Sequence, residues 1–205
     1  MSDVPDTLNN PLWAPRPVAQ TLAIYADWAA TYDDDVVGAG YATPGRITDA
    51  LLDYVAPDAR VLDFGCGTGL SGLALTTNGF GAVDGTDISP QMLDIASARG
   101  VYSALWQSQP GALDITPGDY AAIVATGVIS LGAAPPETLD LVLSKLARGG
   151  ILALSFNDPT VADGSYDAAL SRAVDAGTCD VAFRQNGPHL PGKDMGSDVL
   201  ILRRL

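Results

Sequence analysis

The sequence is poor in basic side chains. It has 11 Lys and Arg against 24 Asp and Glu over 205 residues, and its formal net charge is −13. Proteins hold nucleic acid mainly by neutralising phosphates with cationic side chains, so this deficit argues against a nucleic-acid partner and against an anionic membrane surface. Glu137 is the only glutamate, and we expect most of the aspartates to lie on a solubilising surface, at caps and turns.

Cysteine and histidine are scarce, and long apolar runs are missing. Cys66 and Cys179 are the only cysteines, which excludes a disulfide framework and predicts no metal site. His189 is the only histidine, and its Gly/Pro surroundings predict a solvent-exposed loop position. No segment resembles a signal peptide or reaches the roughly 20 apolar residues of a membrane span. The sequence therefore predicts a soluble, cytoplasmic protein.

The composition is that of one globular domain, because 47% of the residues are hydrophobic and only 17% are charged. Four prolines in residues 1–18 predict an extended N-terminal arm. The remaining residues, 19–205, are expected to form a single domain. Within it, residues 19–57 are a helical region suited to a lid, and residues 58–205 are an α/β core.

Helices come first in the predicted order of elements. Apolar and aromatic positions at helical spacing predict one helix from Ala19 to about Val36. A second helix is predicted from Thr43, with Thr43 as its N-cap and Pro44 at its first position. Two helices are thus expected before the first strand.

Short β-branched runs then alternate with helical stretches. Strands are predicted at residues 60–64, 81–86, 101–106, 120–126, 150–156, 180–185 and 198–202. Helices are predicted at residues 68–78, 89–99, 136–147 and 165–176. This alternation predicts a doubly wound, mostly parallel seven-stranded sheet with helices on both faces. A Gly/Pro loop joins the last two strands, which should pair as an antiparallel C-terminal hairpin.

The most informative segment is Val-Leu-Asp-Phe-Gly-Cys-Gly-Thr-Gly at residues 61–69. A buried strand runs there into a loop of alternating glycines and then into a helix, which allows a sharp turn and a close approach of a ligand to the backbone. Asp87 follows at the end of the second strand, where an acid can accept hydrogen bonds from both hydroxyls of a ribose. A nucleoside-containing ligand is therefore predicted.

The glycine pattern also fits a dinucleotide cofactor. Gly67-x-Gly69-x-x-Gly72 matches the dinucleotide fingerprint, and Asp87 lies at the expected distance beyond it. In such a site, however, a helix N-terminus faces a pyrophosphate, and the carboxylate of Asp63 at the end of the strand would repel that group. A ligand with an ammonium and a sulfonium group suits Asp63 better.

Three segments resemble the signature segments of class I S-adenosylmethionine-dependent methyltransferases, which have a Rossmann-like fold. They are residues 61–69, the Asp-Ile-Ser-Pro-Gln-Met-Leu run at 87–93 and the Leu-Ala-Arg-Gly-Gly-Ile-Leu run at 146–152. Tyr25-x-x-Trp28-x-x-x-Tyr32-Asp33 and residues 198–204 further resemble the small methyltransferase-like proteins of the Williams–Beuren region type.

The resemblance implies S-adenosyl-L-methionine as cofactor and S-adenosyl-L-homocysteine as product. The residues it assigns to the cofactor are Tyr32, Asp63, Gly65, Cys66, Gly67, Asp87, Ile88, Met92, Ser108, Thr126 and Gly127. The glycine loop would lie against the methionine moiety, with Asp63 near its ammonium group directly or through water. Asp87 would bind the ribose, and Ile88 and Met92 would pack on the adenine. Cys66 is interpreted as a small loop residue rather than a nucleophile, because its neighbours supply neither a base nor a cation.

The acceptor end of the site is less clear from the sequence. Thr126 and Gly127 would lie under the sulfonium, and the aromatic stripe that contains Tyr32 is as suited to core packing as to a lid. Relatives usually carry an acid after the third strand to contact the adenine amino group. Here either Ser108 or Gln109 makes that contact, or the contact is not made. The segment after the fourth strand contains no evident general base.

Three functions fit these observations. The first is a methyltransferase acting on a small soluble molecule by in-line displacement, with a neutral or cationic acceptor favoured by the net charge. The second is a nicotinamide-dependent oxidoreductase, which the glycine fingerprint allows and the position of Asp63 opposes. The third is an S-adenosylmethionine-binding protein without turnover, which the absent base allows.

Overall fold

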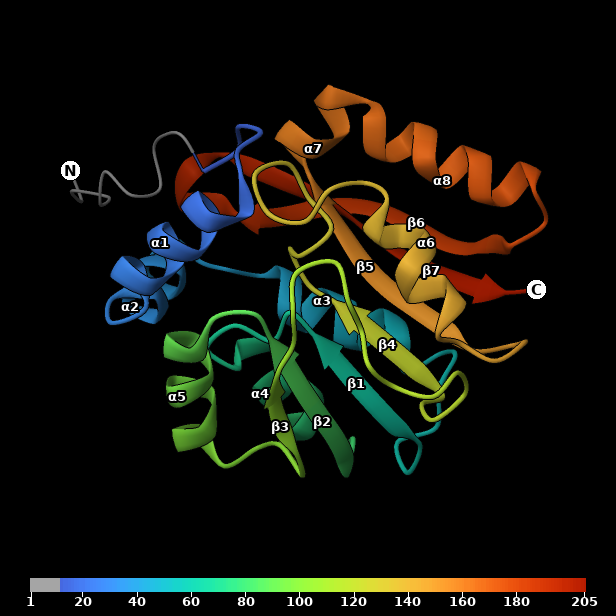
Figure 1. Ribbon diagram of the computed structural model, residues 1–205, viewed down its shortest axis with the longest axis horizontal. Helices are drawn as coiled ribbons and strands as arrows, with labels where there is room; N and C mark the ends of the chain where they lie inside the picture. Colours follow the sequence, from blue (N-terminus) through green and yellow to red (C-terminus); the bar gives the residue numbers. More distant parts are fainter. Residues whose placement is uncertain (1–11) are drawn as a thin grey trace.

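The computed structural model describes residues 12–205, and its centre is a seven-stranded sheet (Figure 1). The strands lie in the order β3-β2-β1-β4-β5-β7-β6. Their bounds are β1 (Arg60–Phe64), β2 (Ala82–Asp87), β3 (Leu105–Gln107), β4 (Ala122–Ala125), β5 (Ile151–Asn157), β6 (Cys179–Leu190) and β7 (Met195–Arg204). The first five strands are parallel, and β7 pairs antiparallel with both β5 and β6. The predicted mostly parallel sheet with an antiparallel C-terminal hairpin is confirmed.

Helices cover both faces of the sheet. They are α1 (Val18–Trp28), α2 (Tyr32–Gly38), α3 (Thr43–Leu51), α4 (Leu70–Thr77), α5 (Pro90–Arg99), α6 (Thr138–Ser144), α7 (Asp158–Asp163) and α8 (Ser165–Asp175), with a 3-10 turn at Pro191–Lys193. Successive residues of a strand point to opposite faces, so Val61 packs with α3 and α4 whereas Leu62 packs with α6 and α8. Each face thus has its own apolar core.

The N-terminal helices differ from the prediction. The expected helix over residues 19–36 is broken into α1 and α2 at residues 29–31, so three helices precede β1. Three acids, Asp33, Asp34 and Asp35, occupy the first turn of α2, where the positive end of a helix dipole favours negative charge. They favour a new helix start at this point over one continuous helix. The predicted extended arm over residues 1–18 lies mostly outside the described residues.

Two further predictions about helix and strand ends were wrong. Ala42, not Thr43, is the N-cap of α3, and no side chain caps this helix. The Gly/Pro segment predicted as the hairpin loop is mostly strand: β6 extends to Leu190 with a register shift after Pro188. A proline is tolerated there because β6 is the edge strand and the sheet is irregular at that point.

The carboxyl ends of the parallel strands lie together on one side of the sheet, and α1 and α2 lie over this carboxyl edge (Figure 1). Ligands bind at this edge in open α/β sheets. The long connection 108–121 between β3 and β4 contains no helix, so it leaves that part of the sheet face to loop residues. Among residues 12–205, no helix combines the length and apolar character needed to cross a bilayer.

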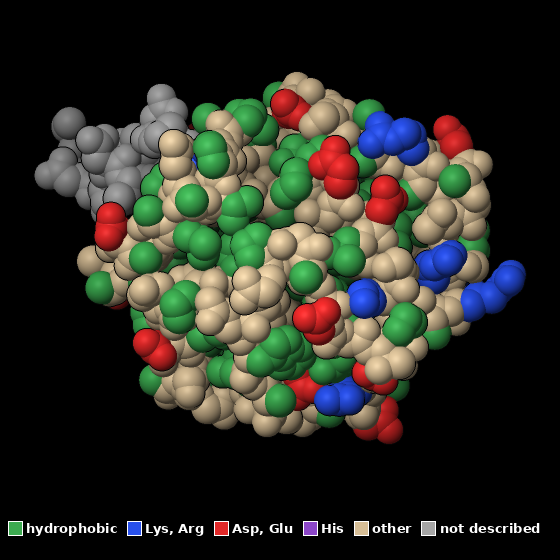
Figure 2. Space-filling model, in the orientation of Figure 1, with side chains coloured by type: hydrophobic (Ala, Val, Ile, Leu, Met, Phe, Trp, Pro, Cys, Tyr) green, Lys and Arg blue, Asp and Glu red, His purple; other side chains and the backbone are tan. Residues whose placement is uncertain are grey.

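The surface agrees with the expected role of most acids. On the face drawn in Figure 2, acidic side chains are scattered, and the basic ones lie on the half that carries the C-terminus. Asp84 is an exception, because it is buried and accepts hydrogen bonds from Arg60 and from the Tyr120 hydroxyl. Asp84 therefore belongs to the hydrogen-bonded interior of the protein and not to its solvated surface.

Candidate functional site

The glycine loop between β1 and α4 is tied to the end of β2. Gly65, Gly67 and Gly69 have φ of 69°, 54° and 93°, a region that favours glycine. The Gly67 N–H donates to Asp87 Oδ2 at 2.9 Å, and the Ser89 N–H donates to Asp87 Oδ1 at 2.8 Å. Asp87 therefore fixes the loop while its carboxylate keeps lone pairs for a ligand.

Burial raises the pKa of Asp87, and its backbone hydrogen bonds lower it. Around this acid lie the residues predicted to contact adenine. Met92 is buried, Ile88 is partly exposed, and the Ser108 N–H donates to the Asp87 carbonyl at 3.0 Å. The structure thus brings Ile88, Met92 and Ser108 together beside Asp87, whereas Gln109 is exposed.

Asp63 is fully buried at the end of β1. Its Oδ2 accepts a hydrogen bond from the Tyr102 hydroxyl at 2.7 Å, and its Oδ1 has no partner among the described residues. Desolvation raises the pKa of Asp63 to about 7, although the Tyr102 hydrogen bond lowers it. An unpaired buried carboxylate oxygen is costly, so this atom is suited to a cationic donor.

Tyr102 was missed by sequence reasoning. Its ring lies against Gly72 and Gly85, and a Cβ atom added at Gly72 would stand 2.3 Å from the Tyr102 ring. Gly72 fits the third glycine of a dinucleotide fingerprint in the sequence, but in the structure it makes room for Tyr102, which reaches Asp63. The glycine within strand β2, Gly85, was the available signal, because glycine inside a strand often marks a close approach.

A cavity of about 70 Å³ lies beside this site, at the carboxyl edge of the sheet. Its lining comes from the N-terminal segment, α1, α2, the loop after β4 and the ends of β5 and β6. The lining residues are Leu12, Trp13, Tyr25, Trp28, Tyr32, Val36, Tyr41, Thr126, Gly127, Ser130, Leu131, Ala133, Asn157, His189 and Leu190. The Thr126 hydroxyl is buried without a partner among the described residues, and the Gly127 N–H donates to Ser155 Oγ at 2.9 Å.

The aromatic stripe of α1 and α2 lines this cavity and also packs in the core beneath the helices. The rings of Trp28 and Tyr32 are 4.6 Å apart, and those of Tyr25 and Trp28 are 6.1 Å apart. The Trp28 indole N–H donates to Asp35 Oδ2 at 2.6 Å, which joins α1 to α2. Burial raises the pKa of Tyr25 and of Tyr32, so their hydroxyl groups stay protonated and both rings form uncharged walls of the cavity.

Helix α2 is tied to the glycine loop through Asp33. The Thr68 hydroxyl donates to Asp33 Oδ1 at 2.6 Å, and Arg99 at the end of α5 forms an ion pair with Asp33 Oδ2. Arg99 also donates to the Thr68 carbonyl at 2.5 Å. Of the three acids in the first turn of α2, Asp33 and Asp35 are partly buried and accept hydrogen bonds from side chains, whereas Asp34 is exposed.

His189 is buried, contrary to the predicted exposed loop position. Strand β6 continues past it, and its Nδ1 lies 2.7 Å from Thr43 Oγ1. Its ring meets the Tyr41 ring edge-on at 5.3 Å. Burial and Arg46 lower the pKa of His189 to about 4, while Asp158 raises it, so the ring is neutral at pH 7. Cys66 agrees with its predicted minor role, because burial raises the pKa of its thiol.

Comparison with known proteins identifies the class. A family model described as "Methyltransferase domain" matches residues 40–189, so the chain belongs to this methyltransferase family. Magnesium protoporphyrin IX methyltransferase from Synechocystis PCC 6803, solved with S-adenosylmethionine bound, superposes with a TM-score of 0.65 at 19% identity, over 98% of this chain and 90% of that one. The expectations of a class I methyltransferase fold and of its cofactor class are confirmed at the level of the family.

Curated relatives are more similar in sequence. Methyltransferase-like protein 27 of Homo sapiens is 32% identical over 164 residues, which are 77% of this chain and 66% of that protein. Ribosomal protein L11 methyltransferase of Ectopseudomonas mendocina is 35% identical over 159 residues, which are 68% of this chain and 53% of that protein. The chain thus spans between half and two thirds of the length of these relatives. The predicted resemblance to the Williams–Beuren type is consistent with the human match.

Proposed function

We propose that the chain transfers a methyl group from S-adenosylmethionine to a small molecule bound in the aromatic-lined cavity. The observation that carries this proposal is the buried, unpartnered Oδ1 of Asp63 behind the glycine loop, with Asp87 at the end of the neighbouring strand. The Asp63 carboxylate suits an ammonium group, and the Asp87 carboxylate suits a pair of ribose hydroxyls. Both lie at the edge where ligands bind in such sheets.

The residues present fit this cofactor. Asp63 would bind the ammonium group, the backbone at Gly65, Cys66 and Gly67 would lie against the methionine chain, and Asp87 would bind the ribose. A Cβ atom at Gly65 would stand 2.5 Å from Val128, so the loop fits only as glycine there. A pyrophosphate would instead face Asp63, which disfavours the nicotinamide alternative.

Ile88, Met92 and Ser108 would form the adenine end, and Thr126 and Gly127 the sulfonium end beside the cavity. When bound, S-adenosylmethionine supplies an electrophilic methyl group on a sulfonium that leaves as a neutral thioether. The chain's own residues would orient the acceptor in line with that methyl group and exclude water, with α1, α2 and Tyr32 as a lid. No general base is required when the acceptor atom is already a thiolate, a neutral amine or a carboxylate oxygen.

The position of the cavity favours a small acceptor. Residues of α1 and α2 form part of its wall, so it suits a small molecule or the end of one side chain better than a folded surface. Because the L11 enzymes named above are protein methyltransferases, a protein side chain is the competing acceptor. Mass spectrometry after incubation with S-adenosylmethionine and either a metabolite pool or a protein extract separates the two. S-adenosylhomocysteine formed only with the protein extract would overturn the small-molecule acceptor, and none with either pool would indicate a binding protein without turnover.

Cofactor affinity should depend on pH through Asp63. Its pKa of about 7 is raised by burial and by Asp87, and an ammonium partner favours the charged form, so binding near neutral pH releases a proton. We expect the affinity for S-adenosylhomocysteine to fall as the pH falls from 7.5 to 5.5. Below the pKa of Asp63, the loss of affinity should approach tenfold for each pH unit. Calorimetry in buffers of different ionisation enthalpy measures both effects, and a pH-independent affinity without proton release would contradict this role.

The Asp33 contacts should strengthen cofactor binding by holding α2 on the glycine loop. We expect Asp33→Ala to weaken S-adenosylhomocysteine binding by about 3- to 10-fold, because a partly buried ion pair and one hydrogen bond contribute roughly 1 kcal/mol. Asp34→Ala is the matched control, since the neighbouring Asp34 is exposed. Equal affinities of the two variants would show that the α2 contacts do not support the cofactor site.

A further inference from the structure

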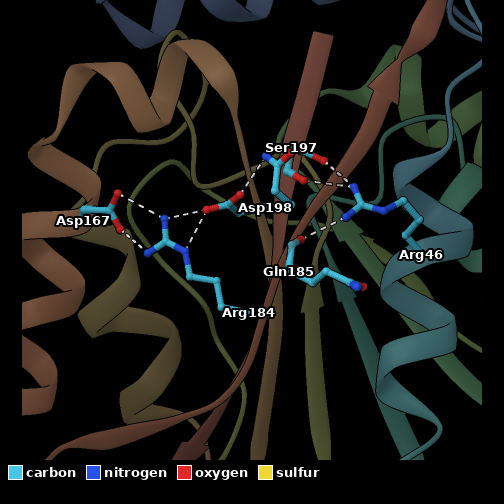
Figure 3. Close-up of polar contacts among 7 residues, drawn as sticks. Arg46, Asp167, Arg184, Gln185, Ser197 and Asp198 are labelled. Atoms are coloured by element: carbon cyan, nitrogen blue, oxygen red, sulfur yellow. Dashed lines mark hydrogen bonds and ion pairs between the residues drawn. The ribbon is translucent and has the colours of Figure 1, made fainter.

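The buried His189 ends a chain of side-chain hydrogen bonds that starts at Arg46. Arg46 on α3 donates to Ser197 Oγ at 3.1 Å, Ser197 Oγ lies 3.1 Å from Thr43 Oγ1, and Thr43 Oγ1 lies 2.7 Å from His189 Nδ1. Figure 3 shows Arg46 reaching from its helix to Ser197 on β7 and to the Gln185 carbonyl on β6. The guanidinium can only donate, so the first bond of the chain has a fixed direction.

The donor and acceptor in each of the other hydrogen bonds follow from the Arg46–Ser197 bond. Ser197 Oγ accepts from Arg46, and the only described acceptor for its own hydrogen is Thr43 Oγ1. Thr43 then donates to His189 Nδ1. The reverse order would leave the hydrogen of the fully buried Ser197 hydroxyl without a described acceptor, which is costly. His189 Nδ1 is therefore an acceptor, and in the neutral ring the proton is on Nε2.

Asn157 at the end of β5 is oriented in a similar way. Its Oδ1 accepts from the Thr160 N–H at 3.1 Å and from the Thr160 hydroxyl at 2.6 Å. Two donors assign this atom as the oxygen, so the amide nitrogen is the other one. Asn157 and His189 both line the cavity, and neither Asn157 Nδ2 nor His189 Nε2 has a hydrogen-bond acceptor among the described residues.

We propose that the His189 Nε2–H and the Asn157 Nδ2–H bind an oxygen of the methyl acceptor, and that this acceptor is an aromatic molecule with a carbonyl or carboxyl oxygen. The cavity walls supply the rest of the recognition, because five aromatic side chains line it: Trp13, Tyr25, Trp28, Tyr32 and Tyr41. Aromatic walls alone would also suit an ammonium group, but two donors with no free lone pair would repel it. This inference rests on the proposed function and assigns its acceptor class.

Two near-isosteric variants separate positioning from folding. His189→Asn offers an acceptor to Thr43 but lacks the Nε2–H. Asn157→Asp keeps Oδ1 for Thr160 and replaces the donor by an oxygen. Asn78→Asp at the exposed end of α4 is the control for the added charge. Benzamide, benzoate and benzylamine are matched probes that present a carbonyl, a carboxylate and an ammonium on the same ring.

Binding of the three probes is measured by calorimetry on the full chain saturated with S-adenosylhomocysteine. We expect the wild type to bind benzamide or benzoate at least tenfold more tightly than benzylamine. Each site variant should lose at least tenfold in affinity for that oxygen probe, Asn157→Asp should shift the preference toward benzylamine, and Asn78→Asp should match the wild type. Affinity for S-adenosylhomocysteine should stay within about twofold in all variants.

Other results overturn the assignment. Benzylamine binding as tightly as the oxygen probes, no binding of any probe to the saturated wild type, or unchanged oxygen-probe binding in both site variants would each contradict it. Failure of the wild type to bind S-adenosylhomocysteine would instead contradict the proposed function, and this is measured first. Benzamide against benzoate then distinguishes a neutral carbonyl from a carboxylate.

Discussion

Asp63→Asn is expected to weaken S-adenosylmethionine binding by about 100-fold, or roughly 2.7 kcal/mol, because it removes a charge-assisted hydrogen bond inside a water-poor site. Asparagine keeps an oxygen for the Tyr102 hydroxyl, so the packing of that ring against Gly72 and Gly85 is preserved. What changes is the unpartnered Oδ1 and the negative charge. Isothermal titration calorimetry at pH 7.5 measures the loss.

Asp180→Asn is the matched control for this substitution. Asp180 also has a buried Oδ1 without a partner among residues 12–205. It lies at the start of β6, near the amino ends of the parallel strands, whereas the glycine loop lies at their carboxyl ends. We expect wild-type affinity from this variant. Equal losses from the two substitutions, or no loss from Asp63→Asn, would mean that the Asp63 carboxylate does not bind the ammonium group.

Asp87→Ala is expected to weaken binding by about 150-fold or more. It removes the two hydrogen bonds that the ribose hydroxyls would donate to the carboxylate, each contributing about 1.5 kcal/mol or more, and it also releases the Gly67 and Ser89 N–H groups that Asp87 holds. Asp94→Ala, at an exposed position on α5, is the control.

A ribose contact has a specific signature. The wild type should bind S-adenosylhomocysteine more tightly than an analogue that lacks the ribose hydroxyls, and Asp87→Ala should remove most of that difference. A variant that is weaker for both ligands by the same factor would show that Asp87 acts only through the loop.

The parts of the site that could be predicted from the sequence are those determined over short distances along the chain. The glycine loop, Asp63 before it and Asp87 after the next strand belong to one strand–loop–helix–strand unit. Adjacent parallel strands bring their ends together, so the register of Asp63 beside Gly85 follows from the alternation of elements. The same reasoning predicted the strand order at the level of a doubly wound sheet with a C-terminal hairpin.

The residues that the sequence did not reveal depend on contacts between distant segments. Asp33 pairs with Arg99 across 66 positions, and Thr43 contacts His189 across 146 positions. No local pattern reports such pairs. The prolines and glycines around His189 predict a loop, but an edge strand with a register shift accommodates these residues. The burial of this histidine follows from the packing of α3 against β7, which composition does not indicate.

The acceptor end of the site was also hard to predict from the sequence. Asn157 is the last residue of β5 and caps α7. The sequence pattern did not predict this helix, although Asn157 followed by Asp158 and Pro159 is a typical helix start. The absence of a base after β4 led to a binding protein without turnover as an alternative. In our proposal, the Asn157 and His189 side chains at the ends of β5 and β6 would donate hydrogen bonds that orient an acceptor rather than deprotonate it.

Calorimetric titration of the wild-type chain with S-adenosylmethionine and, separately, with NADH tests the central claim most directly. We expect one S-adenosylmethionine to bind per chain at micromolar or tighter affinity and to be displaced by S-adenosylhomocysteine, and we expect no measurable NADH binding. Saturable NADH binding without S-adenosylmethionine binding would contradict it, because a site that accepts a pyrophosphate beside Asp63 is not the site described above.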